Sequence, residues 1–574
     1  MKKFLSVLLA VMMLLALVPS VFAEEAGTVN RFGWEVPAET IKIVYYSCDD
    51  DQTDQAEEDE RLAEIHQVFL DEFNIDITKI IYSQDSTERL NLMLAANNYP
   101  DVIVGLSDEM ANTFIEQGRA IELTPYLEEY GQDILASYGD YIGLLKEEDG
   151  SLYKLSSSCG NTTDMMGSDF SLRWDWFEET GMAVPTSMEE YYEVVKAMVA
   201  NHPTNDNGEK VYAFTAFTME GKEFYRTPLQ FLGFYSVSTG IYKMDENGTI
   251  TYWVDTDEGR QIAHYINKFW QEGLIDPDFQ SKDYESSKAF MSNSRVAGNI
   301  GTWWHNFVGG HQIWETTDEN YTINKRMQEF TWQETEAYPT LISNNYIRTT
   351  RVIITDKCAD PAGVVKYWNW QQSPVAIALN SMGLPGEDKA WDFDEEGKIK
   401  VNEKYWYGDP GNTSFLWDDF EEDCGSWNYV MTNPSYTPES RKDNPSEGWA
   451  SPVAQVNMWD LIPDYSLLDS ERLSTGMQMY QFDALTSVSY MVDTTAWTTT
   501  FSSEDEVSLI LQDVDEALLT DWCNCIMASS DEECDALYDL MVEDLHDLGL
   551  DKLVAAQQAA LSENMAKMDG TYWQ

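Results

Sequence analysis

The chain has 574 residues, which is enough for two or three domains of ordinary size. Hydrophobic residues make up 43% and aromatic residues 13% of it, so it can bury sizeable cores. Its formal net charge of −64 argues against nucleic acids and anionic membrane surfaces as partners, and it disfavours a polyanionic ligand. The same acidity suits the solubility of a secreted protein.

The N-terminus has the pattern of a secretory signal peptide. Lys2 and Lys3 supply the charged start, residues 4–18 the apolar segment, and residues 21–23, Val-Phe-Ala, the cleavage site. We expect the mature chain to begin near Glu24. No later apolar run approaches the roughly 18–20 residues that a membrane-spanning helix needs. The sequence therefore predicts a secreted protein.

Strands and helices alternate in the first part of the chain. Residues 41–47 are β-branched or aromatic and predict a first strand, residues 58–73 a helix, and residues 75–77 the start of a second strand. Residues 87–96 predict a further helix, and residues 102–106, VIVGL, a third strand. This alternation indicates βαβ units and a mostly parallel sheet.

The segment 172–217 carries several signals of local structure. Thr186 or Ser187 precedes a helix that has acidic residues in its first turn, which is typical of a capped N-terminus. Apolar residues recur at helical spacing between residues 191 and 198, so one face of this helix should be buried. The elements expected to follow are a turn at residues 205–208 and a strand at residues 211–217.

Later segments continue the alternation. Residues 241–253 predict a hairpin that closes at Asn247-Gly248, and residues 256–272 predict an amphipathic helix. Residues 383–402 predict a second hairpin. The remaining expected elements are a strand at residues 296–300, a helix at residues 361–372 and a last long helix at residues 550–568.

Three motifs occur in the same order as in one protein family. Residues 149–155 match DGKIYGLP, residues 172–191 match R-x-D-W-L-x-x-x-G-x-x-x-P-x-T-x-x-E-Y, and residues 273–306 match G-L-I-D-P-[DE]-F followed by G-x-W. The chain therefore resembles the extracellular solute-binding proteins of ABC importers, family 1, in the branch of LplA-like lipoproteins and oligosaccharide binders. The matching residues of the second motif are Arg173, Asp175, Trp176, Gly181, Pro185, Thr186, Glu190 and Tyr191.

The resemblance implies an α/β fold of the type II periplasmic-binding-protein kind, in which two α/β lobes joined by multiple crossovers hold a ligand cleft between them. Residues 38–155 with 343–382 would form an N-terminal lobe, and residues 156–342 with 383–574 a C-terminal lobe. It also implies a monomer that closes about a hinge on its ligand and then docks on the transmembrane subunits of an ABC permease.

An aromatic-lined cleft suits sugars, because the C–H face of a pyranose stacks on a ring while its hydroxyls need fixed polar partners. Trp303 and Trp304 lie where a strand should leave its sheet, after Gly298 and Gly301. The resemblance implies a tryptophan that stacks on ligand at this place. The other candidate ligand-binding residues are Arg173, Trp174, Tyr46, Arg348, Asn345, Trp427 and Tyr429. We expect a neutral oligosaccharide rather than a uronic one.

We expect neither a metal nor a cofactor. Some members of the family hold calcium in a loop after the capped helix, but here Pro203 stands where a carboxylate belongs and Phe214 where a bidentate glutamate belongs. Residues 392–403 fit the spacing of an EF-hand loop, yet their flanks favour a hairpin turn. The cysteines of residues 523–534 lack a CxxC pair and a nearby histidine, which favours buried or loosely paired thiols over zinc.

No G-x-S-x-G, Walker or H-E-x-x-H motif occurs, so we expect a binding protein rather than an enzyme. Two alternatives stay open. One is a secreted glycan-active enzyme, which product formation would reveal. The other is a glycan-binding module that works without a transporter. The family usually has a lipobox cysteine, but none occurs before Cys48, which favours ordinary secretion and keeps the second alternative open.

Overall fold

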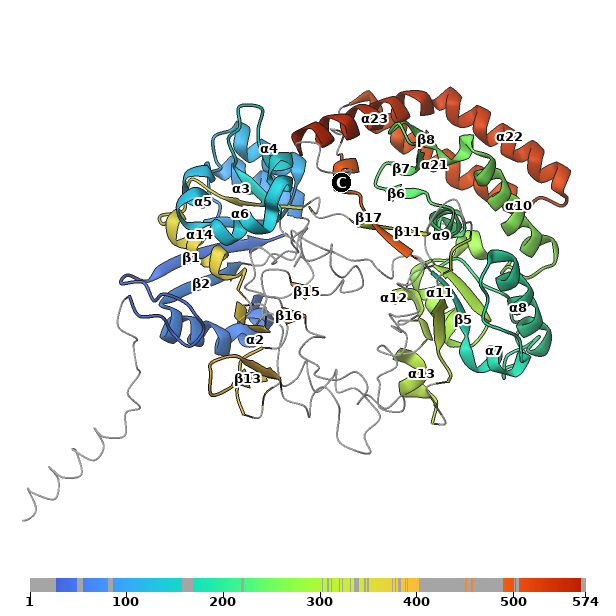
Figure 1. Ribbon diagram of the computed structural model, residues 1–574, viewed down its shortest axis with the longest axis horizontal. Helices are drawn as coiled ribbons and strands as arrows, with labels where there is room; N and C mark the ends of the chain where they lie inside the picture. Colours follow the sequence, from blue (N-terminus) through green and yellow to red (C-terminus); the bar gives the residue numbers. More distant parts are fainter. Residues whose placement is uncertain are drawn as a thin grey trace, which may run out of the picture.

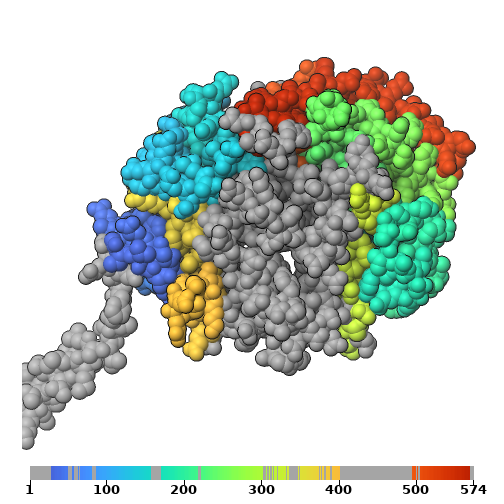
Figure 2. Space-filling view, viewed as in Figure 1, coloured from blue at the N-terminus to red at the C-terminus, as the bar shows by residue number. Residues whose placement is uncertain are grey.

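The structure is a computed structural model. It describes residues 27–48, 55–80, 86–156, 169–217, 221–301, most of 303–401, 450–451, 456–457, 489–499, 501 and 505–568. The described helices and strands form two groups, which we call the first lobe and the second lobe (Figure 1). The space-filling view places these lobes on opposite sides of the molecule (Figure 2).

A five-stranded sheet forms the first lobe, in the order β2-β1-β3-β12-β4. Strand β1 pairs in parallel with β2 and β3, and β12 runs antiparallel to both of its neighbours, β3 and β4. The predicted parallel pairing is therefore confirmed for the first three strands, but the sheet as a whole is mixed, because two of its four pairings are antiparallel. The strands span Ile41–Ser47 (β1), Ile75–Ile80 (β2), Val102–Ser107 (β3), Lys154–Ser156 (β4) and Thr350–Ile354 (β12).

Apolar side chains leave both faces of this sheet, because successive residues of a strand point to opposite sides. Ile43 and Tyr45 of β1 belong to the large core, whereas Tyr46 belongs to a smaller core on the other face. Helices of the first lobe contribute further residues to both cores. They are α2 (Gln55–Val68) with a π-helical turn (Phe69–Phe73), α3 (Ser86–Ala96), α4 (Asp108–Glu116), α5 (Thr124–Tyr130), α6 (Gln132–Tyr138), η2 (Gly139–Leu145) and α14 (Pro361–Trp370).

The second lobe contains a three-stranded antiparallel sheet in the order β10-β5-β9. The strand predicted at residues 211–217 is shorter than expected. Only isolated parallel bridges form there, from Tyr212 to Val296 and from Phe214 to Ile275. The sheet strands are β5 (Asp169–Arg173), β9 (Gly298–Gly301) and β10 (Met327–Phe330).

Helices surround this sheet and extend the second lobe to the C-terminal part of the chain. The side chain of Ser187 accepts a hydrogen bond from the backbone N–H of Glu190 and so caps helix α8 (Met188–Asn201). Of the two predicted cap residues, Thr186 and Ser187, the structure thus selects Ser187. The predicted hairpin at Asn247-Gly248 is confirmed, because β7 pairs antiparallel with β8. No described helix is both long and apolar enough to cross a membrane.

The elements of the second lobe are α7 (Trp174–Thr180), α8 (Met188–Asn201), α9 (Glu223–Phe231), β6 (Tyr235–Val237), β7 (Gly240–Met244), β8 (Ile250–Tyr252), η4 (Trp253–Asp255), α10 (Asp257–Gln271), η5 (Phe279–Ser281), α11 (Tyr284–Ser292), α12 (Trp303–Asn306), α13 (Gln312–Thr317), η8 (Thr495–Trp497), α21 (Glu506–Ile526), α22 (Asp531–Leu548) and α23 (Leu550–Lys567). Two further strand pairs are β11 (Thr340–Asn344) with β17 (Ser489–Asp493), and β15 (Ala450–Ser451) with β16 (Val456–Asn457).

The second predicted hairpin forms, but it packs on the first lobe. Strands β13 (Trp391–Phe393) and β14 (Ile399–Val401) pair antiparallel. The ring of Phe393 lies 6.0 Å from that of Phe32, in an edge-on arrangement. Phe32 in turn stacks on Phe73 of the first-lobe core. This position differs from the predicted grouping of residues 383–574 with the second lobe, and aromatic packing is its physical cause.

The last helix reaches from one lobe to the other. Helix α23 is held to the second lobe by Gln557, which is fully buried and donates to the carbonyl of Trp497 at 2.8 Å. Its C-terminal end meets η2 of the first lobe, where a Cβ on Gly143 would lie 2.7 Å from the carbonyl oxygen of Lys567. Figure 1 shows this end of α23 beside the first lobe. Glycine at 143 is therefore required for the close approach.

One carboxylate joins two of the strands at which the chain crosses between the lobes. Strand β4 is the last strand before the chain leaves the first lobe, and β12 is the first strand after it returns. Asp108 accepts a hydrogen bond from Nε of Arg351 on β12 at 2.6 Å, and it pairs with Nζ of Lys154 on β4 at 3.2 Å. The side chains of both cations are only 9% exposed. We call Asp108, Lys154 and Arg351 the crossover clasp.

Replacing the acid of the clasp should destabilise the protein. The Asp108→Asn variant leaves two nearly buried cations facing a neutral amide, and breaking such a pair costs about 3 kcal/mol. We expect its free energy of unfolding in urea to fall by about that amount. The Asp539→Asn variant is the control, because Asp539 pairs with Arg260 at 2.5 Å but its side chain is 69% exposed. An equal loss in both variants would contradict the prediction, since exposed pairs contribute under about 1 kcal/mol.

The clasp should also contribute to acid sensitivity. Burial raises the pKa of Asp108, but the charges of Arg351 and Lys154 outweigh burial and hold the pKa below its usual value. A carboxyl with a lowered folded pKa stabilises the protein above its unfolded pKa of about 4, and that stability is lost as pH falls through the folded pKa. The stability difference between wild type and Asp108→Asn should therefore be constant near neutral pH and shrink below about pH 4. Urea unfolding between pH 7 and pH 3 measures it, and a difference that grows on acidification would overturn this explanation.

Candidate functional site

The predicted ligand-binding residues differ in how far the structure describes them. Asn345, Arg348, Trp427 and Tyr429 lie outside the described residues. Trp303 and Trp304 form the first half of the short helix α12, which follows β9 as the sequence predicted for the strand exit. Their backbone alone is described. The contact of these residues with a ligand remains a prediction.

Tyr46 lies in the core of the first lobe. It is 1% exposed and belongs to the small core that also contains Leu106, Met110 and Ile353. Because side chains alternate along β1, Tyr45 and Tyr46 point to opposite faces of the sheet. Both rings are buried, one on each face of the sheet. A ligand contact of Tyr46 is still untested.

Arg173 ends β5 and is 5% exposed. Its guanidinium makes two parallel hydrogen bonds to the carboxylate of Asp175, from Nε at 2.8 Å and from Nη2 at 2.9 Å. It also lies over the rings of Trp176 and Trp314, at 4.3 and 4.9 Å from their centroids. The planar guanidinium of arginine can make two parallel hydrogen bonds to a carboxylate and stack on aromatic rings at the same time. The described contacts thus engage the guanidinium in an ion pair with Asp175, and a ligand contact of Arg173 remains a prediction.

Trp174 begins α7 and packs against aromatic neighbours. Its ring lies 4.9 Å from that of Phe177 and 6.0 Å from that of Phe330 on β10. The guanidinium of Arg326, the residue just before β10, lies 5.2 Å from the centroid of the Trp174 ring. The side chain is only half-buried, so one part of it remains accessible. Its predicted role in ligand binding is compatible with this position and remains a prediction.

A buried polar network holds α12 on the second-lobe sheet. The side-chain oxygen of Asn306 accepts hydrogen bonds from Oγ of Ser171 on β5 and from Nδ2 of Asn299 on β9, each at 3.1 Å. Nδ2 of Asn306 donates to Oε1 of Glu329 on β10 at 2.8 Å. All four residues are at most 3% exposed. We call Ser171, Asn299, Asn306 and Glu329 the α12 network.

His305 anchors the same helix by stacking. Its ring lies 4.1 Å from that of Phe217 at an interplanar angle of 17°. Burial lowers the pKa of His305 to about 3, so the imidazole is neutral near pH 7. A group that titrates so far from neutral pH is poorly matched to acid–base catalysis. His305 therefore has a packing role.

Two glycines make room for this arrangement. A Cβ on Gly301 would lie 2.8 Å from Nδ1 of His305, and a Cβ on Gly298 would lie 2.5 Å from the hydroxyl of Tyr191. Both distances are too short for a real side chain. Glycine is therefore required at both positions for this close packing. The sequence did not identify Asn306, Ser171, Asn299 or Glu329, although polar residues inside otherwise apolar strands were a usable signal.

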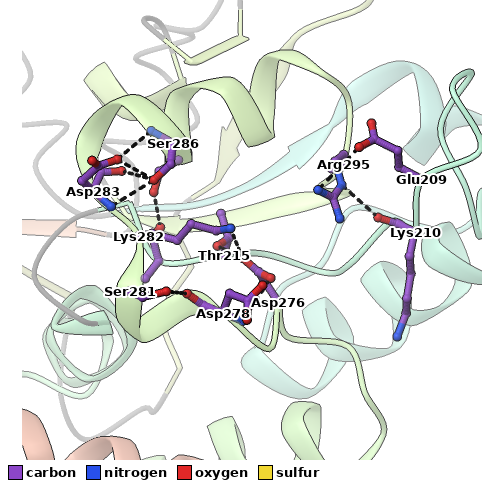
Figure 3. Close-up of polar contacts among 12 residues, drawn as sticks. Glu209, Lys210, Thr215, Asp276, Asp278, Ser281, Lys282, Asp283, Ser286 and Arg295 are labelled. Carbon is purple, nitrogen blue, oxygen red and sulfur yellow. Dashed lines mark hydrogen bonds and ion pairs between the residues drawn. The ribbon is translucent and has the colours of Figure 1, made fainter.

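The Asp-Pro-Asp segment of the third motif is structural. Oδ2 of Asp276 accepts a hydrogen bond from Oγ1 of Thr215 at 2.8 Å and pairs with Nζ of Lys282 at 3.2 Å (Figure 3). Oδ1 accepts from the backbone N–H of Asp278 at 3.2 Å. Asp276 is 2% exposed. Because its carboxylate is used for these contacts, the motif explains how the loop after α10 is held.

The loop aligned with the family's calcium loop is closed by its own hydrogen bonds. Oδ1 of Asn205 accepts from the backbone N–H groups of Asn207 and Glu209, at 3.0 and 2.9 Å. Its Nδ2 donates to the carbonyl of Asn293 at 2.8 Å. Residues 394–398 form a hairpin turn in the same way around Asp394. Within the described part of the chain, no group of three His, Cys, Asp or Glu residues could hold a metal ion.

Comparisons with known proteins agree with this architecture. Residues 56–378, more than half of the chain, match the family described as bacterial extracellular solute-binding protein. The chain is 22% identical over 325 residues to FusA, a fructooligosaccharide ABC transporter substrate-binding protein of Streptococcus pneumoniae serotype 4 (strain ATCC BAA-334 / TIGR4), covering 54% of this chain and 57% of FusA. It is 21% identical over 216 residues to YtcQ, a polygalacturonan/rhamnogalacturonan-binding protein of Bacillus subtilis strain 168, covering 37% of this chain and 41% of YtcQ. The chain thus spans about half the length of these curated relatives.

Solved structures share the fold over nearly the whole chain. FusA in complex with kestose has a TM-score of 0.60 and 16% identity, covering 92% of this chain and 99% of that chain. An HMO-binding ABC-transporter-associated solute-binding protein from Bifidobacterium longum infantis ATCC 15697 also has a TM-score of 0.60 and 16% identity, covering 91% and 98%. These likenesses confirm the predicted type II periplasmic-binding-protein-like fold. The chain belongs to the bacterial extracellular solute-binding proteins.

Proposed function

We propose that this protein is the monomeric substrate-binding subunit of an ABC importer and that it binds a neutral oligosaccharide between its lobes. The carrying observation is that β4 and β12, two strands at which the chain crosses between the lobes, lie side by side in one sheet and share Asp108. Adjacent crossovers allow one lobe to rotate relative to the other, and ligand contacts made by both lobes then favour the closed form. The closed form docks on the permease.

Both the family and the charge support a neutral sugar. FusA, similar to this chain in sequence and in fold, is named for fructooligosaccharides. A formal net charge of −64 repels a polyanion at low ionic strength. YtcQ is named for polygalacturonan, so an acidic sugar is the competing ligand class. The names of FusA and YtcQ, which describe binding proteins, also support a binding protein rather than an enzyme.

Direct binding tests the proposal. Residues 24–574 are titrated by calorimetry with neutral oligosaccharides (fructo-, malto- and xylo-oligosaccharides and milk-type glycans) and with uronic ones, and the recovered sugar is analysed by mass spectrometry. We expect one neutral sugar to bind with a dissociation constant of about 1 μM or tighter, equivalent to about −8 kcal/mol, and to be recovered intact.

Other outcomes each contradict a part of the proposal. Cleaved sugar would show a glycan-active enzyme, and preference for the uronic sugars would overturn the neutral ligand. Binding of a sugar without any stimulation of its uptake by an ABC permease would indicate a module that works without a transporter. Failure of every sugar to bind would refute the oligosaccharide.

Loss of an aromatic platform at α12 should weaken binding. We expect Trp303→Ala or Trp304→Ala to raise the dissociation constant at least tenfold, or about 1.4 kcal/mol, because stacking on the sugar face is lost. Calorimetry with the preferred sugar measures this. Trp270→Ala is the control, since Trp270 packs on Phe279 at the outer helix α10 and should affect stability but not affinity. Unchanged affinity in both α12 variants would remove these residues from the site.

A further inference from the structure

The residue at position 306 occupies a place that only an amide fits well. Its oxygen faces two donors, Ser171 and Asn299, while its nitrogen faces the carboxylate of Glu329. Each contact reaches a different strand of the second-lobe sheet. A carboxylate this deeply buried is costly unless donors satisfy it. Asn306, the last residue of α12, therefore connects this helix to all three strands of the sheet.

The helix that carries Asn306 cannot fix its own position. Helix α12 has only four residues, far fewer than an isolated helix needs to be stable. Its place must therefore come from tertiary contacts, and among the described side chains of α12 these are made by His305 and Asn306. His305 contributes a stacking contact on Phe217, and stacking tolerates sliding and rotation more readily than three directional hydrogen bonds do. The α12 network thus determines where residues 303 and 304 lie.

We propose that Asn306 is a positioning residue for ligand binding: through Ser171, Asn299 and Glu329 it holds the Trp303–Trp304 segment where it meets the sugar. This inference rests on the proposed function, because it assumes that the segment contacts ligand. Asn306 itself touches strands rather than ligand in this role. Its effect on affinity is transmitted through the backbone of α12.

A charge-conserving exchange tests the network. In Asn306→Asp, two buried carboxylates meet at the former 2.8 Å contact with Glu329. In the double variant Asn306→Asp/Glu329→Gln, the carboxylate at 306 accepts hydrogen bonds from Ser171, from Asn299 and from the new amide at 329. All three contacts are thus restored, and only the bond between positions 306 and 329 has its donor and acceptor exchanged. Glu329→Gln alone keeps an acceptor for Asn306 once its amide turns. The total charge of the network is the same in wild type and in the double variant.

Two readouts are measured for each variant: the dissociation constant for the preferred sugar, and amide hydrogen exchange of the peptide that spans residues 301–308 without ligand. We expect Asn306→Asp to raise the dissociation constant at least tenfold and to speed exchange of this peptide at least tenfold. Glu329→Gln and the double variant should both stay within threefold of wild type. Rescue by the double variant is a result that loss of packing at position 306 alone would not produce.

Asn267→Asp is the matched control. Asn267 is fully buried in the same lobe and donates to the carbonyls of Ile526 and Ala528, at 2.8 and 2.7 Å, so its replacement also disrupts a buried amide. It should lower the melting temperature without changing affinity or exchange at residues 301–308. Equal effects of Asn267→Asp and Asn306→Asp, or no rescue in the double variant, would overturn the inference. If wild type binds no sugar, the proposed function fails, and unchanged exchange in Asn306→Asp would separately refute the positioning role.

Discussion

The connection of two lobes through adjacent strands is the constraint on which the structure depends. Strands β4 and β12 belong to the same sheet, so the chain enters and leaves the second lobe at one edge of the first. Asp108 at the start of α4 satisfies a cation on each of these strands. The N-terminus of a helix is a favourable place for this carboxylate. Strands β4 and β12, which carry the chain between the lobes, are thereby tied to helix α4 of the first lobe.

The lobes also meet at a contact between helix α23 and η2. Helix α23 is part of the second lobe, yet its last residues lie against η2 at Gly143. Helix η2 contacts β4, so this meeting point lies close to the crossovers. Rotation about a nearby axis displaces such a contact only slightly. A close backbone contact at a glycine can therefore persist during the proposed closure of the lobes.

Local signals in the sequence predicted the individual elements well, because they depend on neighbouring residues. The cap at Ser187 and the turn at Asn247-Gly248 are of this kind. The signals were weaker where distant partners decide the outcome. Residues 211–217 are as β-branched and aromatic as a strand, but only Tyr212 and Phe214 find strand partners. The hairpin at residues 391–401 was assigned to the wrong lobe because Phe32, far away in sequence, supplies its packing surface.

The candidate site shows the same limit at the level of single side chains. The motif that contains Arg173 was readable, but whether its guanidinium faces ligand or Asp175 depends on geometry that no spacing reveals. Asn306 carried no motif of its own, and its importance comes from three strands that converge on it. Polar residues within buried strands were the one available signal. Such residues must find partners, so their partners can be sought before a structure exists.

The distribution of charge links the architecture to the choice of ligand. The chain has 36 basic residues against 100 acidic ones. Some of the basic residues join distant segments: Arg351 pairs with Asp108, and Arg260 pairs with Asp535. Basic residues engaged in this way stabilise the fold but do little to offset the surplus of acid. The remaining surplus of acid opposes the approach of an acidic polymer, which supports the proposal of a neutral ligand.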